Sequence, residues 1–199
     1  MMKAHGSLSK IALSLLLGLS LAGCFSLSGD LDDTASVSNN AQPRMRNTLR
    51  GQVLENPEEQ IQVRLPRGWE IASPQALNDR ADLYAYSPDR QIYFLVLGED
   101  ANSVSYYNLQ DNAREYRRLL ASRFENAGQE EVTELQAIAG DPAIQYLVRG
   151  QIEGTPVAYL HTTVAANNRY YQVVAWTPET QYNENRDEMQ TVIASFEHS

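Results

Sequence analysis

The hydrophobic and polar residues divide the chain into three regions. An almost wholly apolar run covers residues 11–21, polar residues dominate residues 25–47, and large apolar residues recur at regular spacings from Leu49 onward. The polar region has too few apolar side chains to offset the entropy cost of ordering it, so it is predicted to be a flexible linker. The third region is long enough to bury a hydrophobic core and is expected to form one domain, residues 48–199.

Apolar runs separated by turn residues predict a series of strands in this domain. Ile61, Val63 and Leu65 alternate with polar residues, which is typical of a half-buried strand. The run at 92–97 is apolar on both faces and is therefore expected to be a central strand. Strands are also expected at 83–87, 132–138, 143–152, 157–166 and 170–176, with turns at 88–90, 153–156 and 167–168.

Two helices are expected from apolar residues that recur three or four positions apart. Asn108 is suited to cap the first helix and Gly128 to end it. Thr177 and Pro178 are suited to the cap and the first position of the second helix, which closes the chain. The apolar stripes are Leu109, Ala113, Tyr116, Leu120 and Phe124, and then Tyr182, Met189, Ile193 and Phe196. The sequence thus predicts an α+β fold, an antiparallel β-sheet flanked by helices.

The apolar run near the N-terminus ends in Leu21-Ala22-Gly23-Cys24, which holds the only cysteine of the chain. Lysines precede an apolar segment that is too short to span a bilayer, which is the layout of a secretory signal with a processing site. The tetrapeptide resembles the lipobox of bacterial lipoproteins. The resemblance implies that a signal peptide, residues 1–23, is removed, that Cys24 receives a thioether-linked diacylglyceryl group, and that the new amino terminus is acylated.

Lipid on Cys24 would hold the processed protein on a membrane, because two or more acyl chains give stable anchoring. Residues 24–47 would then link the anchor to the domain. In lipoproteins of bacteria with two membranes, an aspartate after the lipidated cysteine tends to keep the protein at the inner membrane, whereas this chain has Phe25. The resemblance therefore implies a protein of the bacterial cell envelope, on the periplasmic leaflet of the outer membrane.

The chain is acidic, with a formal net charge of −9 at pH 7. Its two lysines both lie in the predicted signal peptide, so processing would lower the charge to −11 and leave no lysine. Binding to nucleic acid or to anionic headgroups needs clustered positive charge, and the composition argues against both. Solubility and adaptation to a saline environment are two simple explanations of the acidity.

Few side chains suited to catalysis remain after Cys24. The remaining histidines are His161 and His198, and the glycine patterns of hydrolase elbows, phosphate loops and dinucleotide sites are absent. We therefore expect a protein that is not an enzyme and has neither a metal site nor a cofactor. One alternative is a hydrolase built on His161, which shares a strand face with Tyr159 and Thr163; a half-exposed histidine with no special task explains the same pattern.

Tyrosines are the more distinctive candidates. Tyr84 and Tyr86 share one face of an expected strand, and Tyr93 shares a face with Leu95 and Leu97. Because tyrosine tolerates both water and burial, an exposed row of these rings would suit contact with a partner protein. The alternative is that the rings only cover the sheet beneath the helices.

Short motifs recur through the domain in a distinctive order. They are Leu65-Pro66-Arg67-Gly68-Trp69, Glu115-Tyr116, Ala139-Gly140-Asp141-Pro142-Ala143, Tyr170-Tyr171 and Ala194-Ser195-Phe196. Their order and spacing resemble the PsbP-like family over about residues 60–196. The resemblance implies an αβα sandwich that usually works by binding another protein, with no shared catalytic residues. The family includes photosystem-associated subunits, a nuclear-transport factor that binds a small GTPase, and bacterial envelope lipoproteins, so one fold carries unrelated tasks.

Three functions remain open at this point. The first is a non-catalytic adaptor, held on the membrane by its lipid, that docks on another protein of the envelope. The second is a carrier or sensor of a small apolar ligand or lipid, held between the sheet and a helix in a tyrosine-lined pocket. The third is a hydrolase that uses His161.

Replacing Cys24 by serine tests the predicted anchor. Cys24→Ser is expected to move the protein out of the membrane fraction, because a hydroxyl group does not form the thioether. The measurement is fractionation of cells in high salt, and Ser26→Ala, two positions away, is the control expected to pellet like the wild type. A Cys24→Ser protein that still pelleted with membranes would mean that the anchor lies elsewhere.

Overall fold

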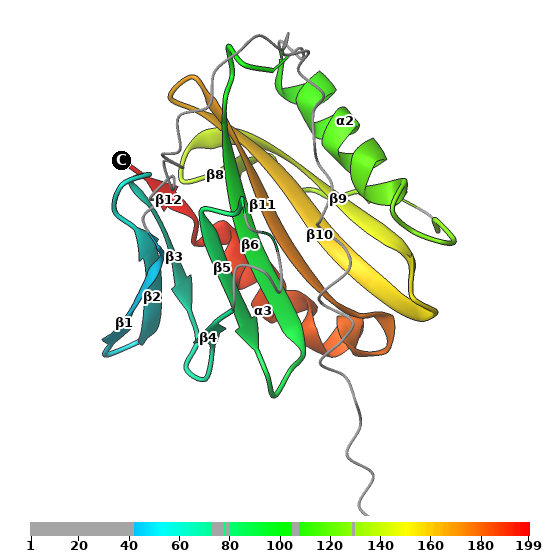
Figure 1. Ribbon diagram of the computed structural model, residues 1–199, viewed down its shortest axis with the longest axis horizontal. Coiled ribbons are helices and arrows are strands. Elements are labelled where there is room, and N and C mark those ends of the chain that lie inside the picture. Colours follow the sequence, from blue (N-terminus) through cyan, green and yellow to red (C-terminus); the bar gives the residue numbers. More distant parts are fainter. Residues whose placement is uncertain (1–41, 73–77, 79, 105–107, 129) are drawn as a thin grey trace, which may run out of the picture.

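The computed structural model describes residues 42–72, 78, 80–104, 108–128 and 130–199 of the chain. A large antiparallel sheet forms its centre, in the strand order β4-β5-β6-β11-β10-β9-β7, with β8 paired to β9. Helix α2 (Leu109–Ala121) covers one face of this sheet, and helix α3 (Tyr182–Ala194) lies against the other (Figure 1). The strands are β4 (Glu70–Ile71), β5 (Leu83–Ser87), β6 (Ile92–Asp100), β7 (Glu130–Val132), β8 (Ala137–Ile138), β9 (Asp141–Ile152), β10 (Thr155–Ala166) and β11 (Arg169–Pro178).

A second, smaller sheet packs beside α3. It has the order β1-β2-β3-β12 and is formed by β1 (Arg44–Thr48), β2 (Gly51–Asn56), β3 (Ile61–Leu65) and β12 (Glu197–His198). Leu54 and Val63 of this sheet share one buried cluster with Met189 and Ile193 of α3. The cluster also contains the facing side chains of the large sheet, so α3 and the small sheet together cover one face of the large sheet.

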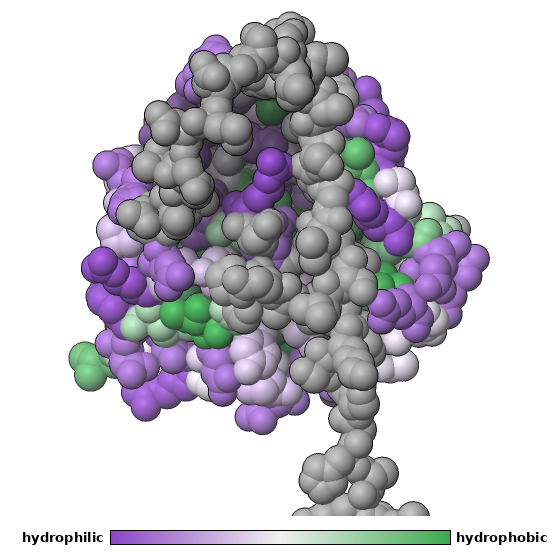
Figure 2. Space-filling view, viewed as in Figure 1, coloured by the Kyte–Doolittle hydropathy of each residue, from purple (hydrophilic) through white to green (hydrophobic). Residues whose placement is uncertain are grey.

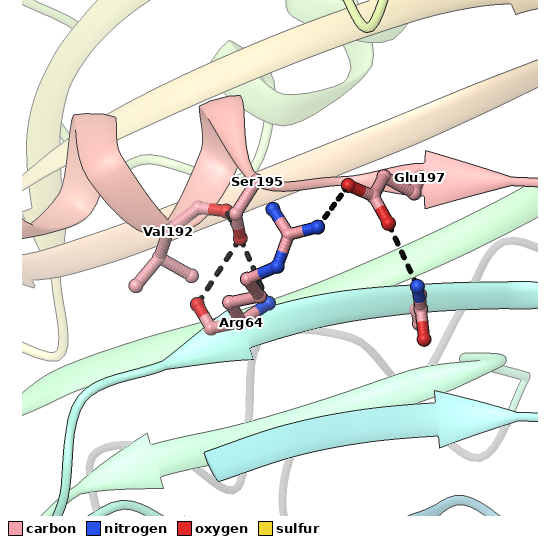
Figure 3. A network of polar contacts seen from close by, with 5 residues as sticks. Arg64, Val192, Ser195 and Glu197 are labelled. Atoms are coloured by element: carbon pink, nitrogen blue, oxygen red, sulfur yellow. Dashed lines mark hydrogen bonds and ion pairs between the residues drawn. The ribbon is translucent and has the colours of Figure 1, made fainter. Parts of the chain in front are cut away.

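Polar contacts hold the end of α3 to the small sheet (Figure 3). Ser195 Oγ accepts the Arg64 N–H at 2.9 Å and lies 2.7 Å from the carbonyl oxygen of Val192. The Arg64 guanidinium pairs with Glu197, whose other carboxylate oxygen accepts from Gln62 Nε2 at 2.7 Å. An exposed ion pair stabilises a fold by only about 0–1 kcal/mol, so the main effect of this network is to position the C-terminal segment.

Two-residue turns connect the three longest strands. Residues 153–154 link β9 to β10 and residues 167–168 link β10 to β11, and all four have positive φ angles between 46° and 75°. Turns of this kind match the twist of antiparallel strands and fix which residues pair. The second turn thereby places Tyr159 directly opposite Trp176.

The chain leaves α2 at Ala121 and turns onto the sheet at Phe124. The Phe124 ring lies directly over Gly150 of β9, since a Cβ atom at Gly150 would be 2.1 Å from Cδ2 of that ring. The Gly128 N–H then donates to the Arg149 carbonyl oxygen at 2.8 Å. Because Gly150 has no side chain, the Phe124 ring can pack directly on β9. This contact positions the segment that follows α2 on the sheet.

The structure confirms the predicted α+β fold and most of the predicted strands. The central position of residues 92–97 is confirmed, because β6 lies between β5 and β11. Asn108 caps α2 as expected, since its side chain accepts the Asp111 N–H at 2.9 Å. The left-handed turn at residues 167–168 is confirmed by its φ angles.

Two predictions between residues 109 and 138 were wrong. The run at 132–138 is not one strand but contains the end of β7 and all of β8, because Thr133 turns to bond the Gln145 side chain at 2.8 Å. Helix α2 ends at Ala121 and does not reach Gly128, because the residues after it hydrogen-bond to β9. In both places tertiary hydrogen bonds end an element that the local pattern would extend.

The prediction of the second helix start was also wrong. Thr177 and Pro178 are the last residues of β11, and the short 3-10 turn η1 (Glu179–Gln181) separates them from α3. Thr177 is buried and accepts a hydrogen bond from Asn185 Nδ2 at 2.8 Å. Thr177 thus contacts α3 from the strand and does not cap the helix.

Strand structure begins before the predicted domain boundary at residue 48. Residues 44–48 form β1, which pairs along its whole length with β2. Met45 packs against the core, and Arg46 pairs with Glu55 at 2.8 Å. These residues look like linker in the sequence because a single apolar side chain among polar ones gives no strand pattern.

The contact between Phe124 and Gly150 can be tested by adding a methyl group at Gly150. Gly150→Ala is expected to lower the free energy of unfolding by about 1–3 kcal/mol, because the added methyl group meets the ring. The measurement is urea unfolding, repeated in a Phe124→Ala background, where the same substitution should cost less than half as much because the ring is gone. An equal cost in the two backgrounds would contradict the proposed contact.

Candidate functional site

Four aromatic rings form a row across the face of the large sheet that α2 covers. Tyr86, Tyr93, Trp176 and Tyr159 occupy directly paired positions of β5, β6, β11 and β10. Neighbouring ring centroids are 6.5, 5.4 and 5.3 Å apart, and the rings are stacked. Such pairs add about 0.5–1.5 kcal/mol each beyond burial of their area, so the row is held in place by the sheet itself.

A buried polar cluster lies beside this row on the same face. His161 is 2% exposed, and its Nε2 atom lies 2.9 Å from Gln172 Oε1. Thr163 Oγ1 donates to the same oxygen at 2.8 Å, and Gln172 Nε2 donates to Asn112 Oδ1 of α2 at 2.8 Å. The cluster therefore joins α2 to β10 and β11 through side chains that are fully removed from water.

An apolar cavity of about 60 Å³ lies between α2 and the sheet. The sheet lines it with Leu95, Val174 and Trp176, and the helix lines it with Tyr116, Leu119 and Leu120. Leu97, Arg123, Tyr159 and His161 also line it. Tyr159 and His161 each have a buried polar atom without a hydrogen-bond partner among the described residues: the hydroxyl of Tyr159 and Nδ1 of His161. Each of these two atoms has less than 1 Å² of exposed area, so they belong to the packed interior beside the cavity and not to its open surface.

Three titratable side chains of the cavity lining, His161, Tyr116 and Tyr159, are electrically neutral at pH 7. Burial lowers the pKa of His161 to about 4, with the Arg117 charge acting in the same direction and the Gln172 hydrogen bond opposing it. Burial and the neighbouring Glu99 carboxylate raise the pKa of Tyr116, and burial raises the pKa of Tyr159. The imidazole is therefore unprotonated at one nitrogen, and both phenols keep their protons.

A second perturbed group lies elsewhere in the domain, near the start of β5. Burial raises the pKa of the Asp82 carboxyl to about 6, and the charge of Glu59 acts in the same direction. The Gly98 N–H, 2.6 Å from Asp82 Oδ2, and the charge of Arg169 oppose this shift. The ion pair between Arg169 and Glu59, at 2.7 Å, gives the Arg169 guanidinium a closer partner.

The tyrosines singled out in the sequence differ in exposure. All three project from the α2 face of the sheet, since Tyr84 pairs with Leu95 and Tyr86 pairs with Tyr93. Tyr84 is 5% exposed and offers almost no surface to a partner, whereas Tyr86 and Tyr93 are half-buried. Most of the described surface visible in Figure 2 is hydrophilic, and its hydrophobic side chains gather in small separate patches.

The histidine singled out in the sequence lies in the interior of the domain. His161 shares a sheet face with Tyr159 and Thr163 as predicted, but it is buried and not half-exposed. Its hydrogen-bond partner is an amide, and among the described residues it makes no hydrogen bond or ion pair with a carboxylate. Cys24 lies outside the described residues. Sequence reasoning missed Gln172, which looks like a surface residue until its pairing with Thr163 is known.

The described part of the chain contains neither a cluster of metal ligands nor a helix suited to span a membrane. No three His, Cys, Asp or Glu side chains gather closely enough there to hold a metal ion. In the same part of the chain, neither helix combines the length and hydrophobicity needed to cross a bilayer.

Asp82 and His161 have opposite effects on stability between about pH 4 and pH 6. The lowered pKa of His161 makes the unfolded state bind more protons there, so its contribution rises with pH; the raised pKa of Asp82 makes its contribution fall with pH. The Asp82→Asn variant is therefore expected to gain about 2 kcal/mol relative to the wild type as the pH rises from 4 to 6. Urea unfolding at four pH values measures this difference, and a difference that stays constant would contradict it.

Comparisons with known proteins agree with this architecture. No family model and no curated protein sequence matches the chain. The solution structure of cyanobacterial PsbP (CyanoP) from Synechocystis sp. PCC 6803 is 12% identical with a TM-score of 0.53, and the match covers 86% of this chain and 100% of that one. The crystal structure of the Saccharomyces cerevisiae Ran-binding protein Mog1p is 13% identical with a TM-score of 0.52, covering 78% of this chain and 96% of that one.

A third match is a crystal structure from Bacteroides thetaiotaomicron, 15% identical with a TM-score of 0.51, covering 76% of this chain and 49% of that one. At these identities the similarity concerns the fold and not the activity. The motifs that carried the resemblance are largely packing positions, since Trp69, Tyr171 and Phe196 are all buried in one cluster. The chain therefore has the PsbP-like fold, as the order and spacing of those motifs predicted.

Proposed function

We propose that the protein is a non-catalytic adaptor of the bacterial cell envelope, held by lipid on Cys24 at the periplasmic leaflet of the outer membrane. The predicted linker that follows Cys24 would let the domain stand off from the bilayer. The observation that carries the adaptor role is the aromatic row across β5, β6, β11 and β10. Its outer members would contact the partner protein.

The outer end of the row has properties of a docking surface. Tyr86 and Tyr93 are half-buried, and the Tyr86 hydroxyl donates to Glu70 at 2.6 Å. Because stacking and this hydrogen bond already order the two rings, little side-chain entropy would be lost on binding. Tyrosine is enriched at protein interfaces for the same combination of apolar ring and polar tip.

The buried position of His161 supports a role without catalysis. A general base must reach the proton that it removes, directly or through one water molecule. His161 is 2% exposed, is bonded to Gln172 and has a pKa lowered to about 4 by burial, which makes it a weak base. Because His161 is buried and a weak base, a hydrolase that uses it has less support than either binding function.

A second candidate is a carrier or sensor of a small apolar ligand. The cavity of about 60 Å³ between α2 and the sheet favours it, because the exposed surface of its lining is almost entirely apolar. Binding sites commonly combine an apolar lining with a few polar groups that orient the ligand. The cavity is much smaller than the roughly 300 Å³ of a typical ligand site, so its occupant would be small or would extend out of it.

Site-specific photocrosslinking tests the adaptor role. A benzophenone amino acid at Tyr86 or at Tyr93, in cells that make the full lipidated chain, is expected to capture the same envelope protein from both positions. The exposed residue Glu184 of α3, on the opposite side of the sheet, is the control expected to capture nothing.

A matched variant makes the result specific to the rings. Tyr86→Ser combined with Tyr93→Ser is expected to reduce co-purification of the captured protein at least tenfold, while far-ultraviolet circular dichroism stays unchanged. Equal capture from Glu184, or unchanged co-purification with the double variant, would exclude this surface as the docking site.

A further inference from the structure

We propose that the outer face of the small sheet, together with the turn between β1 and β2, docks on a membrane surface that carries anionic phospholipid headgroups. The chain as a whole is acidic, so attraction to such a surface needs a local cluster of positive charge. The fold provides one, because five arginines are exposed on the small sheet and its turns: Arg44, Arg46, Arg50, Arg64 and Arg67.

Strand pairing separates the two faces of the small sheet. The core-facing row takes one apolar side chain from each of three strands: Met45, Leu54 and Val63. Side chains alternate along a strand, so the neighbouring row of Arg46, Val53 and Arg64 lies on the outer face. The side chains of Arg46 and Arg64 are 54% and 62% exposed. Two guanidinium groups therefore flank Val53 on the solvent side of the sheet.

The carboxylates of the outer face lie farther from the turn than this row. Glu55 and Glu197 belong to the next row of the sheet, where both flank Gln62. They pair with the guanidinium groups of Arg46 and Arg64. Two carboxylates thus stand against five arginines, and the excess of positive charge lies toward the turn.

Two arginines at this end of the sheet have no such partner. Arg50 lies in the turn, and Arg67 follows the end of β3. Among the described residues, neither side chain makes a hydrogen bond or an ion pair. A Cβ atom at Gly51 would lie 2.5 Å from the Leu65 carbonyl oxygen, so the turn packs against the end of β3 and brings both arginines to one edge.

Exposed apolar side chains lie beside these arginines. Leu49, at the tip of the turn, is 99% exposed, and Ile71 of β4, a strand that contacts β1, is 39% exposed. Proteins that lie on a membrane surface combine apolar side chains, which enter the bilayer, with cationic ones that attract anionic lipids. Guanidinium groups suit this role because their planar donors match phosphate oxygens.

The position of the sheet in the chain favours a membrane over an acidic protein as the partner. β1 is the first described strand after the predicted linker, so lipid on Cys24 would hold the small sheet near the bilayer. In this respect the inference rests on the proposed function. The small sheet and α3 cover one face of the large sheet and α2 covers the other (Figure 1), so docking would turn the aromatic row away from the membrane.

The test uses tryptophan fluorescence of a Leu49→Trp variant of the full chain, isolated with any lipid that it carries. It is mixed with vesicles whose acyl chains are brominated, because bromine quenches tryptophan only on close approach. The native Trp69 and Trp176 are 2% and 6% exposed and so contribute a constant background. We expect quenching with phosphatidylcholine vesicles that contain phosphatidylglycerol, little quenching with phosphatidylcholine alone, and its loss in about 1 M salt, which screens charges beyond about 3 Å.

A matched pair of double variants tests the arginines. Arg50→Gln with Arg67→Gln is expected to lower the ratio of docked to undocked protein by about tenfold or more, because each arginine near an anionic surface changes it roughly fivefold. The control, Arg114→Gln with Arg186→Gln, removes the same charge from exposed positions of α2 and α3 and should leave quenching unchanged. Circular dichroism checks that each variant folds.

Flotation of the same samples separates this inference from the predicted anchor. Protein that floats with both kinds of vesicle but is quenched by neither would overturn the docking surface, leave the anchor standing and favour an acidic protein as the partner of the arginines. Flotation and quenching only with anionic vesicles would support the docking surface and contradict the anchor, whereas flotation with neither would overturn both. Equal quenching by the two kinds of vesicle, or an equal loss in the two double variants, would overturn the role of the arginines.

Discussion

The pairing register of β9, β10 and β11 determines the side chains on each face of the large sheet. Two turns of two residues each, both in the left-handed region, set this register at the ends of β10. Side chains alternate between the faces of a strand, so a shift by one residue would move every side chain of β10 to the other face. His161 and Tyr159 would then face α3, and neither the aromatic row nor the polar cluster would form.

The two faces of the sheet are packed differently. On the α3 side, Met189, Val192 and Ile193 enter a large apolar cluster that includes the small sheet. On the α2 side, the helix buries Asn112 and Ala113, and an amide network takes the place of part of an apolar core. Buried amides are tolerated because they are bonded, which fixes α2 at that point but leaves less apolar area to hold it.

Much of the fold could be derived from local signals, and the site could be derived only in part. The Asn167-Asn168 turn implies that Tyr159 faces Trp176 and that Thr163 faces Gln172, so half of the row and the partner of His161 follow from a hairpin recognisable in the sequence. The pairing of β6 with β11 joins residues about 80 positions apart and leaves no local signal.

Elements with polar or small residues at buried positions were not recognisable from the sequence. Strand β2 buries Gly51 and Asn56 at its ends, so it lacks the alternation that identified β3. The exposure of Tyr86 and the burial of Tyr84 depend on what lies above the sheet, which strand periodicity does not describe. Composition likewise does not distinguish a bonded interior glutamine such as Gln172 from a surface one.

The seating of α2 has a consequence for how the domain opens. Only Asn112 and Ala113 of α2 are buried, whereas α3 buries five residues, and a cavity lies against the C-terminal half of α2. Local unfolding favours segments with few buried contacts, so α2 should separate from the sheet at a lower free energy than α3. Amide protons of α2 would then exchange with solvent through partial opening, and those of α3 only through global unfolding. The same partial opening gives a molecule a route into the cavity without unfolding the core.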